Sequence, residues 1–331
     1  MDTKSYRQAI IQATKFLLSQ QGDDGSLKPV EHGVGTVYKV PFALSTMGQF
    51  DRAARLCAYL LENVMDEEGD LVGHFSRSPL HKHYYLVSNA WITAGAQRLG
   101  QFGLSLRAVD FIGSLQHPES GGFFTAGPAA SIDGEQDMLS TATCGLALLY
   151  CGRLDEAQQA GDYLKALWDR QPAGSARLYT RTKGKDLVTE IEDEEALQSV
   201  LIVGKPGQAY HIPALAAGFL AKLSEATGSG EYLETAQKLV NFLDGCGADR
   251  YQSETSGFFG WAAAILYAGS GNQNYRRIAA AIADGLTQSQ LANGSWLKAS
   301  MGEDLTSDVI DGTAEGIICL TQILEGLCCG E

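Results

Sequence analysis

Two kinds of apolar segment alternate along the chain. In six of them apolar residues recur at three- and four-residue steps between charged ones, which predicts amphipathic helices. These span residues 5–20, 50–63, 104–115, 154–168, 231–243 and 272–290. Six others are apolar nearly all round, which predicts helices buried on every side. These span residues 36–47, 84–99, 138–151, 209–226, 257–268 and 310–324. The alternation predicts an all-α protein, an (α/α)6 toroid with an inner and an outer ring.

Short motifs repeat with the helices. Gly48, Gly100 and Gly152 each follow a buried segment at a spacing of 52 residues, as expected for a repeat architecture whose helices end on glycine. A second motif, Gln-x3-Gly-x-Trp, ends the last amphipathic segment at Gln290–Trp296, with relatives at residues 21–27 and 116–123. We expect its glutamine to bond the carbonyls left open at the helix end, and its apolar residue to fill the space between repeats.

Gln-x3-Gly-x-Trp between buried helices resembles the repeat of squalene–hopene cyclases, class II terpene cyclases and protein prenyltransferase β subunits. The resemblance spans nearly the whole chain at the level of fold. It implies a toroid with its pocket where the buried helices begin. It does not imply the reaction, because function depends on the site and not on the fold.

The segment 174–208 interrupts the fourth repeat. Residues 177–182 and 186–191 read as two short strands around a glycine turn, and the acidic run 192–195 then opens a short helix. We therefore expect one domain, residues 1–331, with a small β-hairpin insertion that is a lid, an oligomer contact or an inert excursion.

The composition of the chain limits the kinds of binding partner that we expect. The 331 residues carry a net charge of −14, which argues against nucleic acid and anionic membranes as partners. The polar start of the chain is unlike a secretory signal, and no apolar run reaches membrane-spanning length. The seven cysteines lack any CxxC pairing, so we expect a reduced, cytoplasmic protein that binds a small molecule; a homo-oligomer stays open.

Residues at the starts of the buried helices should face the pocket mouth. Four of the six histidines fall there, as do several tyrosines and carboxylates. The candidate catalytic residues are Asp311, His83, His81, His211, Asp308 and Tyr210. The candidate substrate-binding residues are His32, Tyr38, Tyr84, Asn89, Asp137, Phe123, Gln208, Glu254 and Trp261. Lys39 and Glu315 also lie at helix starts.

The segment Val309-Ile-Asp-Gly-Thr-Ala314 is similar to the Asp-x-Asp-Asp-Thr-Ala motif of class II terpene cyclases. The resemblance puts Asp311 on the middle position, whose carboxyl protonates an alkene in that family. Val309 and Gly312 replace the aspartates that hold and tune this acid. Asp308 could pair with Asp311 as acid and base, or simply cap the helix.

Two other clusters could carry proton transfer. His81 and His83 would point the same way in an extended segment, as acid–base or substrate-binding groups, whereas a metal site would need a third ligand. Tyr210 and His211 follow a Pro-Gly turn and can serve as donor and base. Asp137 and Cys144 lie seven residues apart, unlike the zinc ligands of protein prenyltransferases, so we predict no metal and no cofactor.

These features predict an enzyme that acts by cofactor-independent acid–base chemistry. Cyclisation, isomerisation, or hydration and dehydration of a small, partly apolar, terpenoid-like substrate fits the resemblance. A carbohydrate epimerase, lyase or hydrolase is the alternative, because that class also uses (α/α)6 barrels with His, Tyr and carboxylates at the rim. A ligand-binding toroid without catalysis is the third possibility.

Overall fold

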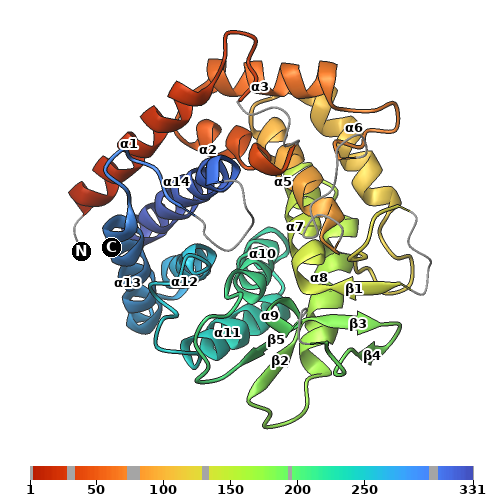
Figure 1. Cartoon of the computed structure of the whole chain (residues 1–331). Helices are drawn as coiled ribbons and strands as arrows, with labels where there is room; N and C mark the ends of the chain where they lie inside the picture. The colour runs from red at the N-terminus through yellow and green to blue at the C-terminus, as the bar shows by residue number, and fades with distance from the viewer. Residues whose placement is uncertain are drawn as a thin grey trace.

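The computed structural model describes residues 3–27, 34–72, 83–128, 134–192, 196–297 and 305–330. Its helices form two concentric rings, and the predicted (α/α)6 toroid is confirmed (Figure 1). The inner ring consists of α2 (Val40–Thr46), α5 (Tyr85–Arg98), α7 (Met138–Tyr150), α10 (His211–Thr227), α12 (Gly257–Ser270) and α14 (Leu305–Cys329). The outer ring consists of α1 (Thr3–Gln20), α3 (Phe50–Asn63), α6 (Phe102–Ser114), α8 (Leu154–Asp169), α11 (Gly230–Asp244) and α13 (Gln273–Ser289).

The core lies between the two rings. Each inner helix contacts its two inner neighbours, and α14 returns to α2, so the inner ring is closed. Each outer helix packs mainly on one inner helix, with α1 on α14, and several also touch the next inner helix. Inner helix α12 is buried without a break from Gly257 to Tyr267, whereas outer helix α13 buries a single stripe. This difference follows from the two hydrophobic patterns. No helix in the described ranges is long and apolar enough to cross a lipid bilayer.

The chain turns from inner to outer helix on glycine. Gly48, Gly100 and Gly152 adopt φ values of 68°, 69° and 76°, as predicted, and Gly228 and Gly271 make the same corner after α10 and α12. A Cβ at any of these five positions would meet no atom within 4 Å. The glycine is therefore needed for its left-handed backbone and not for lack of space.

The repeated glutamine has a different role from the one we expected. Gln116 lies just past the end of α6, and its Nε2 donates to the carbonyl of Gly121 in its own loop (2.8 Å) and to that of Glu156 in α8 (2.9 Å). The other two copies repeat this pair of bonds: Gln21 with Gly25 and Arg52, and Gln290 with Gly294 and Ala9. Each glutamine lies past the end of its own helix, so its side-chain amide reaches a carbonyl of the next outer helix. The motif therefore links successive outer helices.

The loop glycine makes the same link possible. Gly121 has a φ of +74°, and a Cβ there would lie 2.3 Å from the carbonyl oxygen of Gln159 in α8. The backbone of the loop thus rests directly on the neighbouring helix. A Cβ on Gly25 would likewise lie 2.6 Å from the carbonyl oxygen of Arg55, and one on Gly294 would lie 2.7 Å from that of Gln12.

The last repeat closes on the first. Tyr6 in α1 donates its hydroxyl to Asp284 Oδ1 in α13 at 2.5 Å, and the bond from Gln290 to Ala9 joins the same two helices. Helices at opposite ends of the chain therefore become neighbours, and the outer ring has no open end.

The insertion after α8, joined by strand β1 from just before α7, forms two small sheets (Figure 1). Strands β1 (Glu135–Asp137), β3 (Arg181–Lys183) and β4 (Asp186–Leu187) form one antiparallel sheet, in which Gln136 pairs with Thr182. Strands β2 (Arg177–Tyr179) and β5 (Val200–Ile202) form the other, and α9 (Ala196–Ser199) precedes β5. The predicted strand 177–182 is interrupted at Thr180, because the amide of Thr180 bonds Ser199 O and its carbonyl accepts from Met138.

Alanine substitutions can separate the two uses of glycine. Gly152→Ala should cost only the left-handed backbone strain of a non-glycine residue, about 1–2 kcal/mol. Gly121→Ala should lower the free energy of unfolding by about 2 kcal/mol more, because its Cβ also collides with a helix carbonyl. Chemical denaturation of both variants measures the difference. Equal losses of stability would show that the close approach between Gly121 and α8 is unimportant.

Candidate functional site

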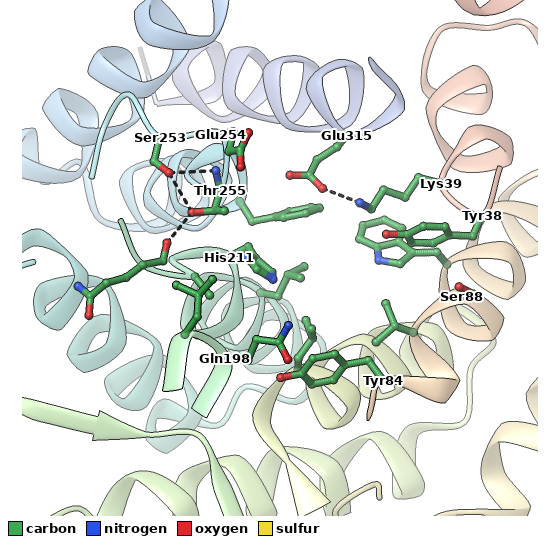
Figure 2. Close-up of a pocket in the computed structure, with 18 of the residues that line it drawn as sticks. Tyr38, Lys39, Tyr84, Ser88, Gln198, His211, Ser253, Glu254, Thr255 and Glu315 are labelled. Atoms are coloured by element: carbon green, nitrogen blue, oxygen red, sulfur yellow. Dashed lines mark hydrogen bonds and ion pairs between the residues drawn. The ribbon is translucent and has the colours of Figure 1, made fainter. Parts of the chain in front are cut away.

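A cavity of about 230 Å³ opens where the inner helices begin, as the resemblance implied. Its walls combine polar groups with aromatic and aliphatic side chains. The lining residues are Tyr38, Lys39, Tyr84, Val87, Ser88, Trp91, Leu139, Leu197, Gln198, Gly207, Gln208, Ala209, His211, Leu215, Ser253, Glu254, Thr255, Phe258 and Glu315. In Figure 2, Tyr38 and Lys39 lie across the cavity from Ser253, Glu254 and Thr255, and His211 points between them.

A buried ion cluster lies against this cavity. Lys39 Nζ lies 3.0 and 3.1 Å from the two carboxylate oxygens of Asp311, and 2.5 Å from Glu315 Oε2. All three side chains are at most 8% exposed. The cluster joins the residue that precedes α2 to two residues one turn apart on α14, and so bridges the first and last inner helices.

The carboxylates determine the charge of the lysine. Burial alone would lower the pKa of Lys39, and the first turn of a helix also disfavours a cation. The negative charges of Asp311 and Glu315, together with their hydrogen bonds, outweigh burial and raise this pKa above its ordinary value. Lys39 is therefore a fixed cation and not a proton acceptor. In turn, its ammonium group forms a buried ion pair with Asp311.

The loop before α10 fixes His211. Gln208 accepts from the amide of Ile202 and donates to the carbonyls of Ile202 and Lys205, which closes the turn. Tyr210 donates to Asp249 Oδ1 at 2.7 Å, so this predicted catalytic residue anchors the loop on the side away from the cavity. Burial, reinforced by Asp249, raises the pKa of Tyr210. His211, the first residue of α10, is thus held in place with its ring at the cavity.

The loop before α12 is tied to the same turn. Thr255 donates its hydroxyl to the carbonyl of Gln208 at 2.8 Å and accepts from the amide of Tyr210 at 3.3 Å. Glu254, the residue before it, lines the cavity. The positions of His211 and Glu254 are therefore coupled through short backbone contacts.

Five of the predicted site residues line this cavity: Tyr38, Tyr84, Gln208, His211 and Glu254. Asp311 reaches it only through Lys39. His83 lies just before α5 and is not among the described lining residues. His32 and His81 lie outside the described residues, and so does the side chain of Asp308.

The remaining candidates have structural contacts instead. Asn89 accepts from the amide of Leu71 and donates to buried Asp70, which holds the turn at residues 66–72. Phe123 is fully buried. The ring of Trp261 packs directly against the backbone of Gly218, since a Cβ on that glycine would lie 2.2 Å from the ring. These aromatic side chains fill the interior of the toroid.

Asp137 caps a helix. Its Oδ1 accepts from the amide of Ser140 at 2.7 Å, at the start of α7. Burial raises the pKa of Asp137 to about 6, against the opposing effects of the Ser140 bonds and Arg181. Cys144 is fully buried on the same helix, and its thiol pKa is raised by that burial. Within the described ranges, no group of three or more His, Cys, Asp or Glu residues could hold a metal ion.

Several residues that line the cavity were not among the candidates named from the sequence. Ser88 and Trp91 follow Tyr84 by four and seven positions, so one helical stripe faces the cavity. That period was readable from the sequence. Leu197 and Gln198, by contrast, come from α9 in the insertion, and only the folded structure shows that they reach the site.

The comparisons with known proteins agree with this fold. No protein-family profile and no curated protein matches the sequence. Among solved structures, D-mannose isomerase matches with a TM-score of 0.70 at 14% identity over 98% of both chains. A sugar epimerase from a ruminal bacterium matches with a TM-score of 0.71 at 12% identity, over 98% of this chain and 99% of that one.

A type II terpene cyclase shares the fold as well. A variant of MstE from Scytonema, in complex with geranylgeranyl dihydroxybenzoate, matches with a TM-score of 0.61 at 14% identity over 98% of both chains. At such identities the likeness establishes a shared α/α toroid, which both terpene cyclases and sugar enzymes use. The activity has to be inferred from the site.

Removing the buried cation tests the cluster. Lys39→Met leaves two carboxylates buried side by side, which should lower the free energy of unfolding by about 3–5 kcal/mol. Adding Glu315→Gln and Asp311→Asn to this variant should recover much of the loss, because no unpaired charge remains. Thermal or urea unfolding of both variants measures this. A Lys39→Met protein as stable as the wild type would contradict the cluster.

Proposed function

We propose that this protein is a cofactor-independent isomerase or epimerase of a small, neutral sugar. The observation that carries the proposal is the pairing of Asp311 with Lys39, while His211 and Glu254 face the cavity. An aspartate that forms an ion pair with a buried lysine is unsuited to protonating an alkene. A histidine with a neighbouring carboxylate suits proton transfer near neutral pH.

The proposed reaction needs only such proton transfers. Once the bound sugar ring has opened, His211 would take the proton from the carbon next to the carbonyl, while Tyr38 or Tyr84 donates a hydrogen bond to the oxygen that gains charge. This forms an enediol. Return of the proton to the neighbouring carbon, with a proton passing from the second oxygen to the first, gives the isomer. Protonation of the original carbon from its opposite face, by a second group or a water molecule, gives the epimer. The atoms balance and no electrons leave the substrate.

The charge around the cavity favours a neutral substrate. Lys39 contributes one positive charge, whereas Asp311, Glu315 and Glu254 contribute three negative ones, so these four residues sum to −2. A phosphate or carboxylate on the substrate would be repelled at this short range. An uncharged polyol would find donors and acceptors on the same walls.

The cavity volume favours a small ring. An apolar cavity of about 150 Å³ binds benzene. At about 230 Å³ this cavity holds a six-membered ring with a few substituents. Trp91 and Phe258 offer apolar faces on which such a ring can pack, and Tyr38, Tyr84 and Gln198 offer hydrogen bonds. The likeness to D-mannose isomerase and to a sugar epimerase supports the same substrate class.

A terpenoid-like substrate is the second candidate. Leu139, Leu215, Trp91 and Phe258 give the cavity a large hydrocarbon wall, and the terpene cyclase MstE shares the fold. A compact, singly unsaturated hydrocarbon with a polar group would suit this wall. Its reaction would have to proceed by weak acid–base catalysis, at a carbon that the polar group activates, and not by strong-acid protonation of an alkene.

Deuterium exchange tests the proposal. The protein is incubated with neutral aldoses and ketoses in D₂O, and NMR follows isomer formation and deuterium at the carbon next to the carbonyl. Turnover of at least one sugar is expected. His211→Asn should lower kcat by about 10²–10⁴-fold with little change in substrate binding.

His117→Asn is the matched control. This histidine also lies near a helix end, where its Nδ1 accepts from the amides of Glu119 and Ser120, but it does not line the cavity. Its substitution should leave turnover within about twofold of the wild type. The sugar proposal fails if no neutral sugar exchanges deuterium, and the role of His211 fails if both variants behave alike.

A further inference from the structure

A second cavity of about 140 Å³ lies beside the first, between α12, α13 and α14. Its hydrocarbon wall comes from Ile282, Leu286, Trp296, Leu297 and Cys319. Four glycines, at positions 257, 285, 312 and 316, also line it. Among the residues singled out from the sequence, Glu254 and Trp296 of the repeated motif line this space.

Tight packing around it holds the cavity open. Trp296 donates its indole N–H to the carbonyl of Leu286 at 2.8 Å, and its backbone amide donates to Thr313 Oγ1 at 3.1 Å. A Cβ on Gly316 would lie 2.5 Å from the Trp296 ring, and one on Gly257 would lie 2.8 Å from Cys319 Sγ. The ring and the thiol therefore rest on bare backbone. Walls fixed in this way cannot move inward to fill the space.

The two cavities share a wall. Ser253, Glu254 and Glu315 line both of them. A molecule that spans the cavities would pass these two carboxylates, with its polar part beside His211 and its apolar part beside Trp296. The chemistry would then take place next to the junction.

We propose that the second cavity binds a compact apolar arm of the substrate, such as an aryl ring or a short branched alkyl group. The inference rests on the proposed function, because the arm is taken to extend from the sugar. The volume matches the roughly 150 Å³ that accommodates benzene. The hydrocarbon wall favours an uncharged group, and the shared carboxylates repel anions.

The tryptophans provide a direct test with benzyl alcohol as the probe. The chain has four tryptophans. Trp296 lines the second cavity, Trp91 lines the first, and Trp168 lies half-buried on outer helix α8. The intact protein is labelled with 5-fluorotryptophan, and each ¹⁹F resonance is assigned by a Trp→Phe variant. Benzyl alcohol should shift the Trp296 resonance in a saturable way and leave that of Trp168 unchanged.

Two serine variants complete the experiment. Ser289 and Ser19 both lie near the end of an outer helix, each with its hydroxyl bonded to the carbonyl three residues earlier, but only Ser289 lines the cavity. Ser289→Phe should weaken the binding of benzyl alcohol by about tenfold or more, and Ser19→Phe by less than about twofold. Both positions are exposed, so both variants should fold.

The outcomes separate this inference from the proposed function. A saturable shift at Trp91 alone, no shift at either tryptophan, or equal effects of the two serine variants would overturn the second binding site. Since the probe contains no sugar and no turnover is measured, a failure of the sugar proposal leaves this result unaffected. Conversely, sugar turnover without benzyl alcohol binding at Trp296 would leave the proposed function intact and remove the arm.

Discussion

A buried cation held between two carboxylates connects the architecture of this protein to its chemistry. Lys39 precedes the first inner helix, and Asp311 and Glu315 belong to the last, so the cluster spans the point where the inner ring closes. Burying such charges is expensive unless every one is paired. The same pairing shapes the electrostatics of the cavity, because it places two acidic side chains beside one cation.

The outer ring is held by a different and repeated device. At three of its junctions a glutamine amide bonds the carbonyl of the next outer helix, and a glycine backbone rests on that helix one turn further on. These contacts use main-chain groups and therefore tolerate changes in the surrounding side chains. The residues at the starts of the inner helices can then differ from one repeat to the next. This explains how a repetitive toroid can hold a site whose lining residues are not repeated.

Much of the fold could be predicted from the sequence, because it follows from local patterns. The hydrophobic periodicity predicted the helices of both rings, and the regularly spaced glycines predicted the turns between them. Boundaries were less certain: α2 begins at Val40, four residues later than predicted, because Pro41 is tolerated only in the first turn of a helix. The direction of the repeated glutamines was also missed, since their partners lie on another helix, 31 or more residues away along the chain.

The site was harder to predict, because its contacts are long-range. The separation of Lys39 from Asp311 is 272 residues, and no local pattern reveals that pairing. Asp137 and Asn89 have the chemistry of binding residues, yet their side chains bond neighbouring backbone and polar groups. His211 and Glu254 line the cavity, and both precede or begin a buried helix at the mouth of the toroid.

The ion pair between Lys39 and Asp311 is central to the proposed chemistry, and difference infrared spectroscopy tests it most directly. Spectra of the wild type and of Asp311→Asn are compared at neutral pH, with ¹³C-labelled aspartate to isolate the aspartate bands. The account predicts that the substitution removes carboxylate bands only. The loss of a protonated carboxyl C=O band would contradict it, and would restore Asp311 as a proton donor poised for alkene chemistry.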